Sequence, residues 1–181
     1  MKKLQAIQVI RDFDKKGKFV FSKHDLCKLF PNDDPKTLDE GLNRLVKDGL
    51  LIRACRGVYV NEYAQSKDSY IIEHIAKVLR KGEYNYVSLE SMLSEYGIIS
   101  QIPIDRLTVM TTGRKGLFKT PYGIIEFTHT KRSLKDILDS VLHIKGRPLR
   151  VATKQAAVRD LKRVGRNVEL IEFENEQDDG D

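Results

Sequence analysis

The sequence predicts an α+β protein made of two domains. The first observation is size, since 181 residues can bury two small cores and the 40% hydrophobic and 32% charged fractions are typical of globular domains. The second is that helical apolar spacing alternates with β-prone runs near the amino terminus. The third is that new helical and β-prone segments follow a polar stretch at 61–67. We therefore expect domains over 1–65 and 66–173, with an acidic tail over 174–181.

The chain begins with two predicted helices and a strand between them. A helix over 3–16 is indicated by four apolar residues at helical spacing, which are Leu4, Ile7, Ile10 and Phe13. The run 19–21 is β-prone. Ser22 can then cap a helix over 23–30, where Asp25 favours the positive end of the helix dipole.

A third helix is predicted between a turn and Gly49. Asp34 can cap its amino end, and Pro35 suits its first position because no amide hydrogen is needed there. Its buried stripe is formed by Leu38, Leu42, Leu45 and Val46. The opposite face carries Lys36, Thr37, Glu40, Asn43, Arg44 and Lys47. Such side chains can read bases or phosphates in a major groove, although a solvated helix face has a similar composition.

A basic hairpin is predicted directly after the third helix. The β-prone runs 50–54 and 57–60 are joined by Cys55-Arg56-Gly57. Helix, strand, helix, turn, helix and hairpin in this order is the arrangement of a winged helix-turn-helix domain. We expect Arg53 and Arg56 to contact a DNA backbone or minor groove, with Lys23 as a further contact. Winged domains that bind proteins instead of DNA are the alternative.

The second domain is expected to be α+β with a small antiparallel sheet. Apolar spacing predicts a helix over 70–79, and Ser88 can cap a second helix with Glu90 on its outer side. Turn-forming glycines separate the β-prone runs 107–112 and 124–130. Because short turns join antiparallel neighbours, these runs predict a meander.

Two more helices are predicted near the carboxyl end. One covers 134–142, and the other starts after Thr153 and ends at Gly165. The outer face of the latter carries Lys154, Arg159, Lys162, Arg163 and Arg166. This face is either a second DNA contact or simply solvated.

Basic and acidic residues are unevenly distributed. The formal net charge is +6, but residues 167–181 carry seven acids and no base, which leaves +13 on residues 1–166. A basic body suits a polyanion because each neutralised phosphate releases counterions, although a basic surface can also be merely solvated. The tail over 174–181 is expected to be disordered, either solvated or screening the basic body.

Catalytic, metal-binding and membrane signals are missing from the sequence. The histidines are His24, His74, His129 and His143, and their spacing is not that of metal ligands. Cys27 and Cys55 do not form a C-x-x-C pair. The run 113–116 lacks the spacing of a phosphate-binding loop. No apolar run approaches the roughly 20 residues that span a bilayer, and no signal peptide is indicated. We expect no enzyme activity, no metal or other cofactor, no membrane partner and a cytoplasmic location.

Three segments and the hairpin resemble one known family. They read SLESMLSEYGIISQIP at 88–103, VMTTGR at 109–114, IEFTHT at 125–130 and RGVY at 56–59. These segments resemble the AbiE-type antitoxins over roughly residues 50–132. The resemblance implies a winged helix domain that represses its own operon and a second domain that neutralises a co-encoded nucleotidyltransferase toxin. In that family neutralisation needs no stable complex, which defines a type IV toxin-antitoxin system in abortive phage infection.

These observations lead to one main hypothesis and two alternatives. The main hypothesis is an antitoxin and autorepressor that binds double-stranded operator DNA, with inverted repeats upstream of its own gene. One alternative is a protein-interaction module that binds its toxin directly. The other is a winged-helix transcriptional regulator unrelated to toxins.

Overall fold

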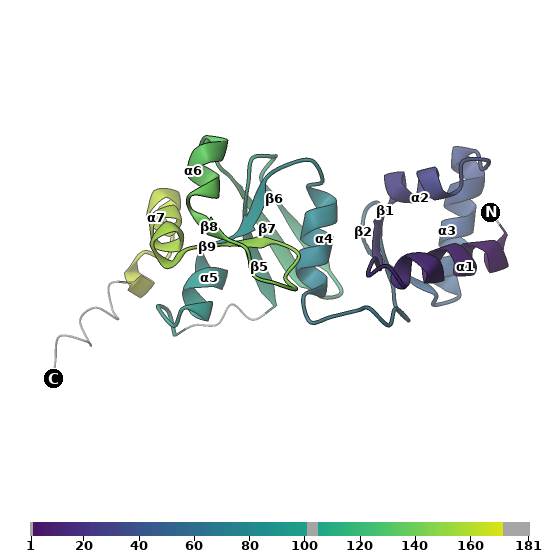
Figure 1. Cartoon of the computed structure of the whole chain (residues 1–181), viewed down its shortest axis with the longest axis horizontal. Helices are drawn as coiled ribbons and strands as arrows, with labels where there is room; N and C mark the ends of the chain where they lie inside the picture. The colour runs from purple at the N-terminus through teal and green to yellow at the C-terminus, as the bar shows by residue number, and fades with distance from the viewer. Residues whose placement is uncertain (1, 101–104, 172–181) are drawn as a thin grey trace. The chain divides into compact units, whose positions relative to one another are not determined.

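The computed structural model describes residues 2–100 and 105–171, and the chain divides into two compact units, Met1–Leu79 and Arg80–Asp181 (Figure 1). Each unit combines helices with a sheet, which confirms the α+β class. Residue 65, the expected boundary, lies inside the first unit because helix α4 (Ile71–Leu79) packs against strands β1 (Val20–Ser22) and β3 (Val58–Asn61). The tail over 174–181 lies outside the described residues.

The first unit has its elements in the predicted order. They are α1 (Lys3–Asp14), β1, α2 (Lys23–Leu29), α3 (Pro35–Lys47), β2 (Leu51–Cys55), β3 and α4. The strands form an antiparallel sheet in the order β1-β3-β2. Because β3 is the central strand, all four of its residues are buried.

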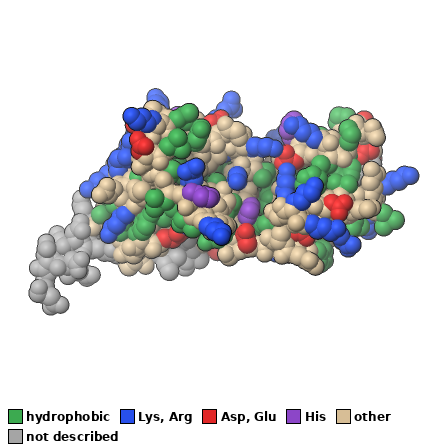
Figure 2. Space-filling view, viewed as in Figure 1, with side chains coloured by type: hydrophobic (Ala, Val, Ile, Leu, Met, Phe, Trp, Pro, Cys, Tyr) green, Lys and Arg blue, Asp and Glu red, His purple; other side chains and the backbone are tan. Residues whose placement is uncertain are grey.

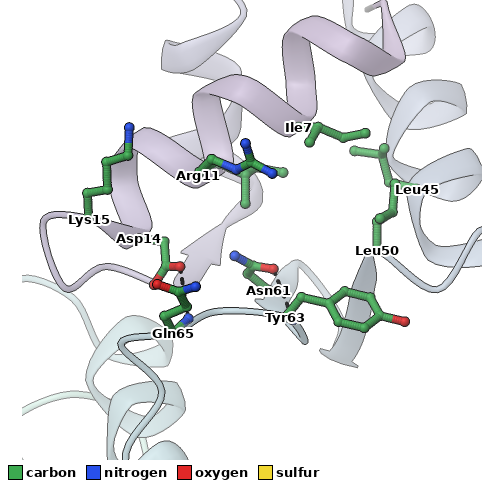
Figure 3. Close-up of a pocket in the computed structure, with 10 residues that line it drawn as sticks. Ile7, Arg11, Asp14, Lys15, Leu45, Leu50, Asn61, Tyr63 and Gln65 are labelled. Atoms are coloured by element: carbon green, nitrogen blue, oxygen red, sulfur yellow. Dashed lines mark hydrogen bonds between the residues drawn. The ribbon is translucent and has the colours of Figure 1, made fainter.

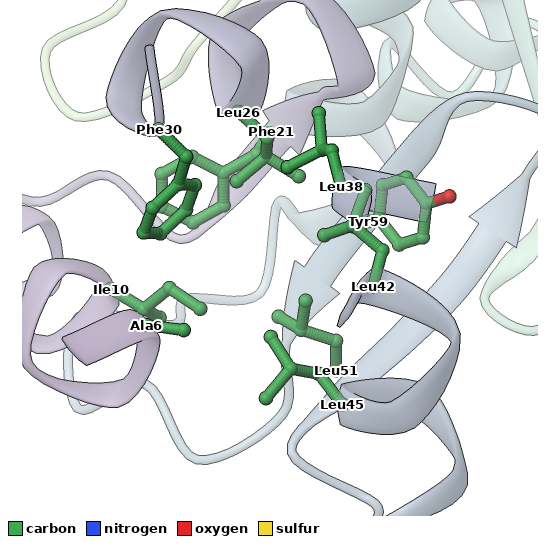
Figure 4. Close-up of a cluster of buried hydrophobic side chains, with 10 residues drawn as sticks. All are labelled: Ala6, Ile10, Phe21, Leu26, Phe30, Leu38, Leu42, Leu45, Leu51 and Tyr59. Atoms are coloured by element: carbon green, nitrogen blue, oxygen red, sulfur yellow. The ribbon is translucent and has the colours of Figure 1, made fainter. Parts of the chain in front are cut away.

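The core of the first unit lies between α1, α2, α3 and the sheet (Figure 4). Three leucines of α3 are at most 2% exposed, namely Leu38, Leu42 and Leu45. They pack with Ile10 of α1 and Leu51 of β2, among others. The predicted buried stripe of α3 is confirmed for its three leucines, whereas Val46 is only partly buried. The polar face of α3 is therefore turned to solvent.

The predicted helix starts in the first unit are also confirmed. The Ser22 hydroxyl accepts from the Asp25 backbone nitrogen at 3.0 Å, and the Asp25 carboxylate accepts from the Ser22 nitrogen at 3.3 Å. This reciprocal pair is a capping box. The Asp34 side chain caps α3, with Pro35 as its first residue. Gly49 has a φ of 71°, which lets the chain leave α3 and enter β2 at once.

The polar segment after β3 is bound to α1 rather than forming a free linker. The Asp14 carboxylate accepts from the backbone nitrogens of Gln65 and Ser66, at 2.9 and 3.0 Å, and from the Ser66 hydroxyl at 2.6 Å. Desolvation raises the pKa of Asp14, but these hydrogen bonds outweigh it and lower the pKa below its ordinary value. Asp14 therefore stays ionised and holds this segment in place.

The second unit contains a six-stranded mixed sheet in the order β6-β7-β5-β4-β9-β8. The strands are β4 (Asn85–Val87), β5 (Arg106–Thr111), β6 (Gly116–Thr120), β7 (Gly123–His129), β8 (Val141–Leu142) and β9 (Arg150–Ala152). The hairpin of β6 and β7 is antiparallel, but β5 pairs with β7 and β4 with β9 in parallel. The prediction of an antiparallel sheet is therefore wrong, because the sheet is mixed. β6 lies at its edge and pairs antiparallel with β7, and β7 runs parallel to β5 on its other side.

The helices of the second unit are α5 (Glu90–Glu95), α6 (Leu134–Leu138) and α7 (Lys154–Val164). As predicted, the Thr153 side chain caps α7, and Gly165 ends it with a φ of 71°. The helix predicted over 134–142 is shorter, because Val141 and Leu142 pair with β9 as strand β8. None of the described helices is long and apolar enough to cross a membrane.

A buried carboxylate joins α7 to the sheet. Asp160 is 1% exposed, and its Oδ2 accepts from the hydroxyls of Tyr86, at 3.1 Å, and Ser88, at 2.9 Å. Ser88 thus donates to Asp160 and does not cap α5, contrary to the prediction. Asp160 Oδ1 lies 3.7 Å from Arg132 and 3.5 Å from Arg159. Desolvation and the Asp160 charge raise the pKa of Tyr86, so its hydroxyl remains a donor.

Candidate nucleic-acid interface

Four of the predicted DNA contacts line one concavity of the first unit. Its volume is about 640 Å³, and we refer to it as the cationic groove. Its lining residues are Lys23, Asp39, Asn43, Arg53, Arg56, Gly57 and Tyr59. The start of α2, the exposed side of α3 and the β2–β3 hairpin therefore contribute to one surface.

A backbone hydrogen bond holds α2 beside the hairpin. The Lys23 nitrogen donates to the Gly57 carbonyl oxygen at 2.7 Å. Gly57 has a φ of 77°, a conformation that is unfavourable for residues with a Cβ atom, so glycine permits this turn. The bond fixes the amino end of α2 next to the turn that carries Arg56.

The hairpin presents two arginines to solvent. The pairing of β2 with β3 shifts register between Arg53 and Cys55, and such a bulge increases strand twist and redirects side chains. Arg53 and Arg56 are both exposed, and within the described part of the chain neither forms an ion pair. Their guanidinium groups are therefore available to an external anion.

The groove also contains an acid that was missing from the predicted set. Lys23 Nζ lies 2.6 Å from Asp39 Oδ1 and 2.8 Å from Asp39 Oδ2. The hydrogen bond to Asp39 raises the pKa of Lys23, so the lysine is charged. The i,i+4 spacing of Asp39 and Asn43 puts both on one face of α3 and could have revealed this acid.

The other predicted contacts on α3 lie outside the groove. Lys36, Arg44 and Lys47 are exposed along the helix. Thr37 has a structural role, since its hydroxyl donates to Asp34 Oδ2 at 2.7 Å and its nitrogen donates to Asp34 Oδ1 at 3.0 Å. Thr37 therefore completes the helix cap, which reduces its availability for a base contact.

The predicted basic face of α7 is divided. Lys and Arg side chains are spread over the visible surface of each unit (Figure 2). On α7, Lys154, Arg159, Lys162 and Arg163 are exposed, and of these Arg159 also donates to the Ser140 hydroxyl at 3.2 Å. Arg159 also lies beside the buried carboxylate described above.

Arg166 is partly buried, with 32% of its side chain exposed. It forms ion pairs with Glu90, at 3.0 Å, and with Glu126. Glu90 is only 8% exposed, so the prediction that it lies on the outer side of its helix is wrong. With both acids as partners, Arg166 does not belong to an exposed basic face, contrary to the prediction.

Comparison with known proteins assigns no family. No protein-family model matches this chain, and no curated protein matches it significantly.

Potential metal ligands do not converge in the residues that the structure describes. No group of three or more His, Cys, Asp or Glu side chains there could hold a metal ion. The two thiols are free, and burial raises the pKa of Cys55. His129 Nδ1 lies 2.8 Å from the Gly113 carbonyl oxygen, and His74 lies 3.1 Å from Asp68.

Proposed function

We propose that the first unit is a winged helix-turn-helix domain through which the protein binds duplex operator DNA as an autorepressor. The order of α1, β1, α2, α3 and the β2–β3 hairpin supports this proposal. The observation that carries it is the cationic groove, in which Lys23, Arg53 and Arg56 meet the exposed face of α3. Cations beside a solvent-facing helix favour the binding of duplex DNA, because the helix fits a major groove and the cations neutralise phosphates.

The proposal assigns a role to each element of the interface. Helix α3 enters the major groove, where Asn43 pairs with adenine and Arg44 and Lys47 contact guanine edges or phosphates. Arg53 and Arg56 contact the neighbouring backbone or minor groove.

Binding to the promoter upstream of its own gene tests this function. Fluorescence anisotropy is expected to give tighter binding to this duplex than to a scrambled one, with log K falling linearly with log salt. Similar affinity for the two duplexes would contradict an operator-specific function.

Asp39→Asn is expected to tighten binding to the promoter duplex several-fold, because it removes an acid near the phosphates and releases Lys23. The matched control is Asp33→Asn, which removes one acid outside the groove.

We further propose that the protein is the antitoxin of a type IV toxin-antitoxin system and acts in the cytoplasm during abortive phage infection. The support is the resemblance of residues 56–59, 88–103, 109–114 and 125–130 to AbiE-type antitoxins. The functional partner is a co-encoded nucleotidyltransferase toxin, with no direct contact required.

Co-expression with that toxin separates this proposal from direct toxin binding. We expect this chain to restore growth that the toxin arrests, and the two proteins to elute separately on gel filtration. Four exposed apolar side chains favour the direct-binding alternative, namely Leu134, Leu138, Leu142 and Ile144, which are 41–49% exposed. A 1:1 complex that Leu138→Glu dissociates and Gln155→Glu does not would support that alternative. No rescue of growth would rule out the antitoxin role.

A further inference from the structure

The first unit contains a second cavity, lined by α1, the end of α3 and the segment after β3 (Figure 3). Its volume is about 560 Å³, which is in the range of small-molecule sites, and it shares no lining residue with the cationic groove. Ile7, Leu45 and Leu50 gather at one end as an apolar wall (Figure 3). Tyr63, 71% exposed, flanks this wall.

A cation borders the apolar wall. The Arg11 guanidinium lies between the apolar end and the polar end of the cavity (Figure 3). Within the described residues the Arg11 side chain has no acidic partner. Asp14, the acid that also lines the cavity, already accepts hydrogen bonds from Gln65 and Ser66. Arg11 therefore has no ion-pair partner among the described residues, and the neighbouring Asp14 carboxylate is held by neutral donors of the segment after β3.

An amide donor lies at the polar end. Asn61 is 8% exposed, and its Oδ1 accepts from the Tyr63 nitrogen at 3.2 Å. This bond turns its amide nitrogen away from Tyr63, towards the side of the cavity that α1 lines (Figure 3). Arg11 and Asn61 thus offer hydrogen-bond donors, which a ligand with acceptor oxygens would satisfy.

We propose that this cavity binds a small amphipathic anion, with an aromatic or branched apolar body and one carboxylate or sulfonate group. The apolar body packs on Ile7, Leu45 and Leu50, and the anionic group pairs with Arg11 and accepts from Asn61. Leu45 and Leu50 belong to the helix and turn that precede the hairpin of the groove. Ligand binding is therefore expected to alter operator affinity, a consequence that rests on the proposed function, whereas the binding itself does not.

Titration of the full chain with 8-anilinonaphthalene-1-sulfonate tests the proposal, because this probe is an aromatic sulfonate that fluoresces in apolar surroundings. We expect saturable 1:1 binding, about tenfold weaker in Arg11→Met, since a charge-assisted hydrogen bond is lost. Lys28→Met removes an exposed cation that does not line the cavity and is expected to leave probe affinity unchanged. Arg11 is exposed, so its variant is expected to fold, with circular dichroism as the check.

Competition identifies the part of the ligand that Arg11 recognises. We expect 1-naphthoate to displace the probe at least tenfold better than neutral 1-naphthalenemethanol. Equal affinity of Arg11→Met and the unmodified chain would overturn the proposal by placing the probe on another apolar surface. A dimer that Arg11→Met dissociates would also overturn it, because the cavity would then be an interface between copies. These readouts use no DNA, so they can fail independently of operator binding.

Discussion

Replacing Arg53 and Arg56 together with alanine is expected to weaken binding to the promoter duplex by about 10- to 100-fold near physiological salt. Both arginines are exposed on the β2–β3 hairpin and line the cationic groove. If each contacts one phosphate, the slope of log K against log salt becomes less steep by about two. Fluorescence anisotropy at several salt concentrations measures affinity and slope together.

A double variant with the same loss of charge provides the control. Lys16→Ala with Lys77→Ala also removes two exposed cations from the first unit, but neither lines the groove. We expect this control to reduce affinity by less than threefold, because distant exposed charges are screened by salt. An equal loss in both double variants would mean that the first unit binds DNA through its overall charge and not through the hairpin.

Replacing Asp160 with alanine is expected to destabilise the protein by about 3–5 kcal/mol, the usual cost of breaking a buried ion pair. The change removes the acceptor of the Tyr86 and Ser88 hydroxyls. It also leaves Arg132, whose Nε is buried, without the carboxylate beside it. Urea unfolding followed by circular dichroism gives the free energy of unfolding.

The control for this prediction lies on the same helix. Lys162→Ala removes an exposed side chain of α7 and is expected to change the free energy of unfolding by less than about 0.5 kcal/mol. A loss below about 1 kcal/mol for Asp160→Ala would mean that Tyr86, Ser88 and Arg132 find other partners when the carboxylate is absent.

Helix ends and buried stripes could be predicted from the sequence because their signals are local. Ser22 and Asp25 are three positions apart, and each caps the other's backbone group. The ends of α7 are local signals too, since the Thr153 side chain caps its start and Gly165 ends it in a left-handed conformation. The apolar spacing of Leu38, Leu42 and Leu45 needed only the helical period to identify the buried side of α3. The hairpin arginines of the groove, Arg53 and Arg56, followed from a separate local signal, two β-prone runs joined by a short turn.

Strand pairing and ion-pair partners could not be predicted in this way. β4, β8 and β9 have only two or three residues each, which is too short for a clear alternating pattern. β5 pairs with β7 in parallel although β6 lies between them in the sequence, and the local sequence does not specify this pairing. The same holds for Asp39, whose position against Lys23 depends on how α2 packs beside α3.

The sequence by itself determined the α+β class, the positions of the helices in the first unit and which face of α3 meets solvent, since these depend on neighbours within a turn or two. Only the tertiary structure decided which cations remain exposed. Arg53 and Arg56 do, whereas Arg166 pairs with Glu90, 76 positions away in the chain. The physical reason is that a charged side chain near the interior must be neutralised by a partner, and the fold decides which acid is within reach.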